Sequence, residues 1–259
     1  MIEVQHYHKR FGPHVAVQDL SFTVRPGELF ALLGPNGAGK TTTIRATVGL
    51  TRPSGGQVRV NGFDVWREPL KAKASFGYIP DRPYLYGKLT GRELLRFIAD
   101  LHGVDPGLAA REIERWLEFF ALEHFGGELI ETYSHGMRQK LTIISALLPQ
   151  PPVLVVDEPM VGLDPRAAKQ VRELFQDYAA RGRTVLLTTH SLPLAEAVAQ
   201  RICVLDRGRV LGLGSLDQLR AQTGTAAGGV DGASLERIFF RLVEEEEQER
   251  QRAAELAGV

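Results

Sequence analysis

Apolar and polar residues alternate along the first part of the chain, as they do in strands with one buried face. Ile2 and Val4 begin the alternation, residues 20–24 repeat it before the turn Arg25-Pro26-Gly27, and residues 57–62 show it again. We therefore expect an antiparallel β element in the N-terminal part of the chain.

The middle of the chain has apolar residues at helical spacing instead. Thr90 and Glu93 have the spacing of a capping box, and the next apolar residues recur every three or four positions. Asp105-Pro106 predicts the start of another helix, because proline is favoured in the first helical turn. Residues from about 82 to 150 are thus expected to form a mostly helical lobe.

From residue 153 onward, short buried runs alternate with helical segments. The runs 153–156 and 185–187 consist of valine and leucine. This arrangement is typical of a parallel sheet that is covered by helices on both faces. The predicted class is therefore α/β, with the antiparallel β element and the helical lobe added to a parallel sheet.

The last forty residues change character twice. Residues 221–233 are rich in glycine, alanine and threonine and are expected to form a linker. Residues 234–259 are expected to form a helical tail, with an apolar stripe at Leu235, Ile238, Phe239 and Leu242 and then an acidic run at Glu244–Glu247. The stripe would dock on the preceding domain, residues 1–220, or on a second copy, and the acidic run is most simply a solvated face.

Composition narrows the class of protein. The 259 residues carry 31 basic and 31 acidic side chains, a net charge of +0, which argues against a dominant nucleic-acid surface. No apolar stretch is long enough to span a membrane, and no signal peptide is apparent, so we expect a soluble cytoplasmic protein. The single cysteine, Cys203, lies in an apolar run and is expected to be a buried hydrophobic residue.

The most specific motif is a glycine-rich loop that fits the pattern G-x-x-x-x-G-K-[ST]. It consists of Gly34-Pro35-Asn36-Gly37-Ala38-Gly39-Lys40-Thr41-Thr42. Such a loop directs backbone N–H groups at the phosphates of a nucleotide, Lys40 reaches the β- and γ-phosphates, and the hydroxyl of Thr41 binds Mg²⁺. The apolar run 29–33 before it and a proline-free segment after it supply the strand and helix that the motif requires, which argues against a chance turn.

A second candidate lies where the run 153–156 ends. Asp157 and Glu158 follow it directly, at the carboxyl end of a buried strand, where ligands bind in open α/β sheets. One carboxylate, Asp157, is expected to hold Mg²⁺, and Glu158 to polarise the attacking water. The alternative is an ordinary acidic pair that enters a turn at Pro159.

Two further features complete the expected site. His190 follows the run 185–189 and would contact a γ-phosphate from the end of its strand, although a lone histidine in such a place is usually structural. In the segment 133–141, Ser134 is suited to cap a helix and Gly136 lets the backbone approach an anion. That helix N-terminus offers a second phosphate site, which suits a nucleotide bound to another copy of the chain.

Taken together, these motifs resemble those of the ATP-binding subunits of ABC transporters. The phosphate loop, the segment GYIPD, the signature YSHGM, the strand VLVVDE, the GLD loop and His190 occur in the order of that family, over about residues 2–220. The resemblance implies a P-loop NTPase core and a head-to-tail dimer that holds ATP and Mg²⁺ between the phosphate loop of one copy and Ser134 of the other. By position, Phe11 would stack on adenine, unless it is a core or turn residue.

Two departures from the family pattern matter, one in the signature and one near the expected metal. The usual signature LSGGQ has His135 in place of a glycine and Met137 in place of a glutamine, and Asp81 stands where a glutamine usually lies near the metal. Asp81 can still accept a hydrogen bond from metal-bound water, but it is shorter and adds negative charge. These changes resemble the branch of exporter ATPases that pair with separately encoded membrane subunits.

We therefore expect an ATPase that drives export through a separate transmembrane permease, as a homodimer or with a paired ATPase subunit, on the inner face of the membrane. Residues near Tyr84 and Tyr86 would face that permease or pack within the helical lobe.

One alternative function is that of a soluble ABC ATPase that acts in cofactor assembly or on nucleic acid. The 94 residues from Lys40 to Ser134 (134 − 40) leave no room for the long coiled coil of DNA-repair members. Another alternative is a regulator that binds ATP without turnover.

Overall fold

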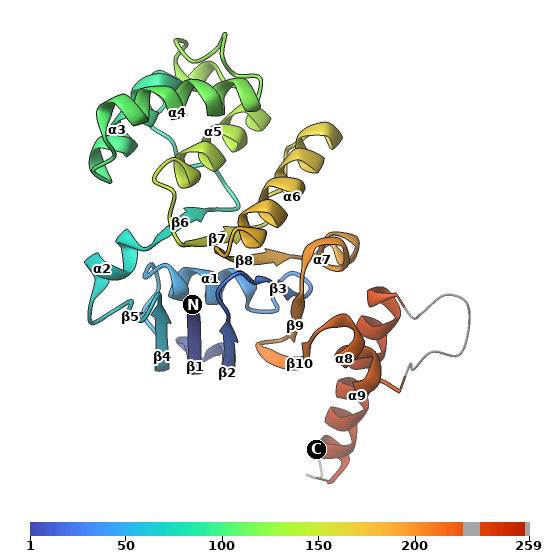
Figure 1. The fold of residues 1–259 in the computed structure, drawn as a ribbon. Coiled ribbons are helices and arrows are strands. Elements are labelled where there is room, and N and C mark those ends of the chain that lie inside the picture. Colours follow the sequence, from blue (N-terminus) through green and yellow to red (C-terminus); the bar gives the residue numbers. More distant parts are fainter. Residues whose placement is uncertain (225–233, 257–259) are drawn as a thin grey trace.

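Two β-sheets organise the protein in the computed structural model, which describes residues 1–224 and 234–256 (Figure 1). The smaller sheet is antiparallel and has the strand order β2-β1-β4-β5. Its strands are β1 (Ile2–Phe11), β2 (His14–Val24), β4 (Gly55–Val60) and β5 (Phe63–Asp64). The predicted antiparallel β element is therefore confirmed.

The larger sheet has six strands in the order β10-β9-β3-β8-β7-β6. All neighbours are parallel except the antiparallel pair β9–β10. The strands are β3 (Leu29–Leu33), β6 (Phe76–Ile79), β7 (Val153–Asp157), β8 (Thr184–Thr189), β9 (Arg201–Asp206) and β10 (Arg209–Gly214). Because β3, β7 and β8 are parallel, their carboxyl ends meet at one edge, which carries the candidate residues.

Helices cover both faces of this sheet, as predicted for the α/β class. The helices are α1 (Lys40–Thr47), α2 (Pro69–Ala74), α3 (Gly91–Leu101), α4 (Pro106–Phe119), α5 (His135–Leu147), α6 (Pro165–Ala180), α7 (Leu192–Val198), α8 (Leu216–Gln222) and α9 (Leu235–Leu256), with a short 3-10 turn at Ile130–Thr132. Thr90 and Glu93 form the capping box at the start of α3, and Asp105 caps α4. Helices α3, α4 and α5 gather at one end of the molecule (Figure 1).

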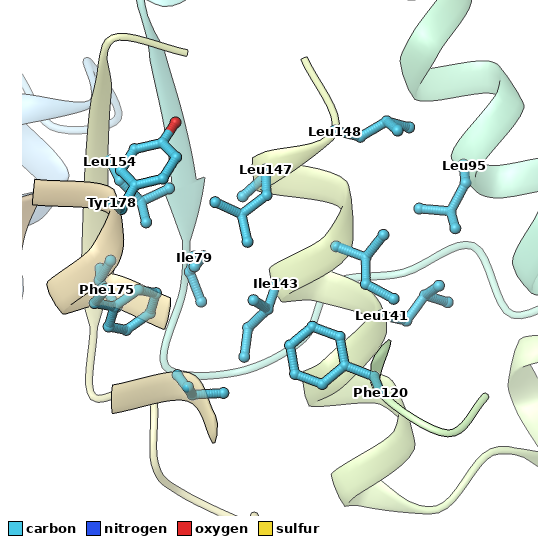
Figure 2. Close-up of a cluster of buried hydrophobic side chains, with 14 of the residues drawn as sticks. Ile79, Leu95, Phe120, Leu141, Ile143, Leu147, Leu148, Leu154, Phe175 and Tyr178 are labelled. Atoms are coloured by element: carbon cyan, nitrogen blue, oxygen red, sulfur yellow. The ribbon is translucent and has the colours of Figure 1, made fainter. Parts of the chain in front are cut away.

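Alternate residues of the central strands enter different hydrophobic cores, because successive side chains of a strand point to opposite faces. Leu154 and Val156 of β7 pack with α5 and α6, whereas Val153 and Val155 pack with α1 and the antiparallel sheet. Figure 2 shows the first core, with α5 between Leu154 on one side and Leu95 of α3 on the other. Helix α5 is thereby wedged between the sheet and the rest of the helical lobe.

The C-terminal helix α9 docks on the same chain. Leu235, Ile238 and Leu242 are buried against β9, β10 and α7, which resolves the choice that the sequence left open for this apolar stripe. The predicted linker 221–233 starts too early, because α8 continues to Gln222, and residues 225–233 of it lie outside the described residues. Within the described ranges, no helix is both long enough and apolar enough to cross a membrane.

Candidate functional site

The glycine-rich loop joins β3 to α1, as the sequence predicted. Two of its glycines are required by close backbone neighbours. A Cβ at Gly34 would overlap the carbonyl oxygen of Leu205, and one at Gly39 would lie 2.8 Å from the carbonyl oxygen of Ala16. Gly39 also has φ +102°, which is unfavourable for residues with a side chain. The loop therefore curls tightly in front of helix α1, and loops of this kind bind anions through their backbone N–H groups.

Lys40 is the first residue of α1 and its side chain is buried. Its Nζ donates hydrogen bonds to the carbonyl oxygens of Gly34 (2.7 Å) and Pro35 (3.1 Å) and lies 3.8 Å from a carboxylate oxygen of Glu158. Burial lowers the pKa of Lys40, while the carboxylates of Glu158 and Asp157 act in the opposite direction. The loop thus encloses the ammonium group of Lys40, which contacts two backbone carbonyl oxygens and the nearby carboxylate of Glu158.

Asp157 lies at the end of β7, directly beneath the loop, and is fully buried. Its Oδ1 accepts hydrogen bonds from the hydroxyls of Thr188 and Thr41, the latter at 3.4 Å. Its Oδ2 has no hydrogen-bond partner among the described residues. Burial is the main reason why the pKa of Asp157 is raised. A buried carboxylate oxygen without a partner costs free energy unless a cation or a donor satisfies it.

The oxygen atoms around Asp157 fit a magnesium ion. Mg²⁺ prefers oxygen ligands, and the Thr41 hydroxyl and the free Oδ2 of Asp157 are of that kind. Asp81 is close enough to raise the pKa of Asp157 through charge repulsion, and it lines the same cavity as Thr41. The three residues that the sequence assigned to the metal therefore lie together.

The carboxylate of Glu158 and the imidazole of His190 lie side by side at the edge of the sheet. Glu158 Oε1 lies 3.0 Å from Nδ1 of His190, because β7 and β8 are parallel neighbours. The backbone N–H of Glu158 donates to the carbonyl oxygen of Thr188 at 3.2 Å, and Glu158 has φ +48°. This left-handed conformation is unfavourable for a glutamate and, like other backbone outliers, is a feature seen at functional sites.

A cavity of about 350 Å³ lies over the glycine-rich loop. It is lined by the loop residues 35–42 together with Phe11, His14, Ala16, Asp81 and Glu158. The ring of Phe11 is 51% exposed, with Lys9 Nζ 4.7 Å from its centroid, so Phe11 is not a core residue. An exposed aromatic face at the mouth of a phosphate-binding loop is suited to stacking on a flat base.

Ser134 and Gly136 do not line this cavity. Ser134 is exposed and caps α5, its hydroxyl oxygen accepting a hydrogen bond from the backbone N–H of Met137 at 3.3 Å. The neighbouring His135 and Arg138 line a second cavity of about 450 Å³, which also borders Asn36, Asp81, Glu158 and His190. Within one copy, the exposed end of α5 therefore stands across a cavity from the phosphate loop.

Two residues of the site were missed by sequence analysis. Thr188 donates to Asp157 from the neighbouring strand, and the register that pairs Asp157 with Thr188 is the signal that locates it. Gln139 is fully buried on α5, and its Nε2 donates to the carbonyl oxygen of Pro159 at 3.3 Å, one residue beyond Glu158. A buried glutamine inside an amphipathic helix is the sequence signal for a polar contact of this kind.

Comparison with known proteins identifies related sequences. Residues 17–161 match the family model described as "ABC transporter". The Linearmycin resistance ATP-binding protein LnrL of Bacillus subtilis (strain 168) is 34% identical over 224 residues, which are 86% of this chain and 72% of that protein. The Nod factor export ATP-binding protein I of Paraburkholderia xenovorans (strain LB400) is 39% identical over 220 residues, 85% of this chain and 72% of that protein.

Solved structures share the fold. A structure described as the ATP-binding subunit of an ABC transporter has a TM-score of 0.88 at 36% identity, covering 94% of this chain and 99% of that one. A dimeric ATP-binding cassette in a post-hydrolysis state, bound to ADP and Pi, has a TM-score of 0.75 over 83% of this chain and 99% of that one. Because the two sequences are only 23% identical, this comparison shows that the two proteins share a fold and nothing more.

Proposed function

The chain belongs to the ABC transporter family as an ATP-binding subunit that hydrolyses ATP to drive transport, and we propose that it powers export through a separate transmembrane subunit. The main structural support for ATP hydrolysis is a cluster of side chains at one edge of the sheet, where Glu158 lies beside both Lys40 and His190. Export is supported by the relative named for Nod factor export, which is 39% identical over 220 residues. A relative named for linearmycin resistance is 34% identical over 224 residues.

Each residue of the cluster has a distinct task in this proposal. The N–H groups of the loop and the ammonium of Lys40 bind the phosphates and stabilise the charge that develops during phosphoryl transfer. Glu158 orients and polarises the attacking water. His190, whose Nδ1 lies 3.0 Å from Glu158 Oε1, would reach the γ-phosphate from the next strand. Phe11 stacks on adenine at the mouth of the cavity.

Magnesium is the proposed companion of ATP. Thr41 and Asp157 would bind it directly, and Asp81 would accept a hydrogen bond from a water molecule on the metal. When bound, the ion neutralises phosphate charge. Thr188 keeps Oδ1 of Asp157 occupied, so that the unpartnered Oδ2 is the oxygen available to the metal.

The active form in this proposal is a dimer of ATP-binding subunits, identical or paired. ABC cassettes of this fold form dimers, as one of the compared structures illustrates. The exposed end of α5, with Ser134 and Gly136, would bind the nucleotide held by the other copy. The 350 Å³ cavity lacks these two residues within one copy, so a second copy would complete the site.

The membrane subunit would dock in a groove beside α3. This groove has a volume of about 880 Å³ and runs between β6, α3 and α5. Its rim carries three exposed residues: Leu70 is 84% exposed, Tyr84 is 77% exposed and Tyr86 is 67% exposed. Exposed apolar and aromatic side chains of this kind are favoured at protein interfaces. An amphipathic helix of the permease would fit there and hold this protein at the inner face of the membrane.

The turnover of a Glu158→Gln variant tests the catalytic assignment. Glutamine keeps the size of the side chain but cannot take a proton, so kcat for ATP should fall by at least about 10²-fold while ATP binding persists. Turnover at the normal rate in this variant would refute the role of Glu158. Co-purification of the wild-type protein from detergent with a transmembrane subunit tests the pairing with a membrane partner separately.

A further inference from the structure

The five residues that follow Glu158 lie against the first half of helix α5. We call residues 159–163 the post-glutamate loop. Buried Gln139 of α5 donates from Nε2 to the carbonyl oxygen of Pro159 at one end of this loop. At the other end, a Cβ on Gly136 would lie only 2.9 Å from the carbonyl oxygen of Gly162. Helix α5 therefore contacts the loop at two points.

His135 makes a further contact at Gly162. Gly162 has φ +79°, and a Cβ there would overlap Cδ2 of the His135 imidazole. The ring thus fills the space that a side chain at position 162 would need. His135 stands where the family signature usually has glycine, which could not fill this space, so the contact depends on this departure from the usual signature.

The loop is coupled to the carboxylate of Glu158 through its own backbone. The N–H of Val161 donates to the carbonyl oxygen of Glu158 at 3.4 Å, and the N–H of Leu163 donates to that of Met160 at 3.2 Å. Asp164 then caps α6 by accepting from the N–H of Ala167 at 2.9 Å. A loop bound at both ends and folded on itself has few ways to shift without moving Glu158.

We propose that His135 is a positioning residue for ATP hydrolysis, whose imidazole holds the post-glutamate loop against α5 and so fixes the carboxylate of Glu158. This inference rests on the proposed function, in which Glu158 prepares the water. Preorganisation of this kind acts on the rate of the chemical step, since a displacement of about 1 Å can cost as much as 10²-fold in rate. Within its own copy, His135 does not line the cavity over loop residues 35–42.

The test is steady-state ATP hydrolysis by His135→Ala, which removes the imidazole but keeps a residue compatible with a helix. We expect kcat to fall by roughly five- to tenfold with KM for ATP within about twofold of the wild-type value. The matched control is His124→Ala, because the side chain of His124 is almost fully exposed on the helical lobe. The control should keep both constants, and His135→Phe, which retains a ring beside Gly162, should recover most of kcat.

A double-mutant cycle with Glu158→Gln separates positioning from general damage. Because His135 acts through the carboxylate of Glu158, Glu158→Gln combined with His135→Ala should be no slower than Glu158→Gln alone. Multiplicative losses would overturn the proposal, as would a wild-type kcat in His135→Ala or a fall in kcat matched by a rise in KM. If the wild-type protein itself fails to hydrolyse ATP, the proposed function fails, whereas an active wild type with an equally active His135→Ala overturns this inference alone.

Discussion

Nδ1 of His190 lies 3.0 Å from the carboxylate of Glu158, although the two residues are 32 positions apart in the sequence (190 − 158). The parallel pairing of β7 and β8 brings them together, since each residue directly follows the end of its strand. The pair places a proton acceptor and a hydrogen-bond donor at the same edge of the sheet, next to Lys40.

Removal of the His190 side chain should slow hydrolysis more than it weakens binding. In His190→Ala, Glu158 loses the partner that orients it, and the γ-phosphate loses a contact. We expect kcat to fall by about 10²-fold and the affinity for ATP to change by less than about threefold. Steady-state ATPase assays and equilibrium binding of a fluorescent ATP analogue measure the two quantities. A fall in ATP affinity as large as the fall in kcat would contradict a role of His190 in the chemical step.

Phe11 should contribute to nucleotide affinity and leave the chemistry unchanged. Its exposed ring offers a flat apolar surface, and stacking of a base on an aromatic side chain contributes about 1–3 kcal/mol. Phe11→Ala should therefore weaken ATP binding by about five- to a hundredfold with little effect on kcat. Phe11→Tyr serves as the control, because it keeps the ring. Unchanged ATP affinity in Phe11→Ala would contradict the assignment.

The magnesium site can be tested by its dependence on Asp157. The replacement of one carboxylate oxygen by an amide in Asp157→Asn removes charge that the metal needs while preserving shape. We expect the Mg²⁺ concentration for half-maximal ATPase activity to rise by at least about tenfold. The control is Thr43→Ser, because Thr43 lies on α1 but outside the proposed metal site. This variant should need the same Mg²⁺ concentration as the wild-type protein. An unaltered Mg²⁺ requirement in Asp157→Asn would refute the site.

The single cysteine provides a probe of global unfolding. Burial raises the pKa of the Cys203 thiol to about 12, so the thiol is both inaccessible and protonated in the folded protein near neutral pH. A disulfide reagent such as DTNB should react only as the protein unfolds in urea, in parallel with the loss of far-UV circular dichroism. Rapid reaction in the native state would show that β9 opens locally.

The same assay should report a loss of about 2–5 kcal/mol in unfolding free energy for Leu154→Ala, a large-to-small change in the core.

Local signals in the sequence predicted several elements of the fold and the two segments that carry the candidate site residues. The glycine-rich loop, the capping box at Thr90 and the acidic pair at the end of β7 all depend on neighbours within a few residues. The two sheets followed from alternation and from short buried runs, because these patterns reflect which faces are covered.

Contacts between distant segments were beyond the reach of such patterns. The hydrogen bond between Thr188 and Asp157 depends on the register of two strands, and the contact of Gln139 with Pro159 depends on how α5 crosses the sheet. The placement of His135 beside Gly162 likewise needs three-dimensional packing. These long-range contacts are the ones that fix the geometry around Glu158.

The most direct test of the central claim is a structure of the Glu158→Gln variant with ATP and Mg²⁺ bound. The account predicts two copies arranged head to tail, with each γ-phosphate contacted by Lys40 of one copy and by the hydroxyl of Ser134 of the other. An ATP-loaded assembly in which Ser134 lies far from every γ-phosphate would contradict it.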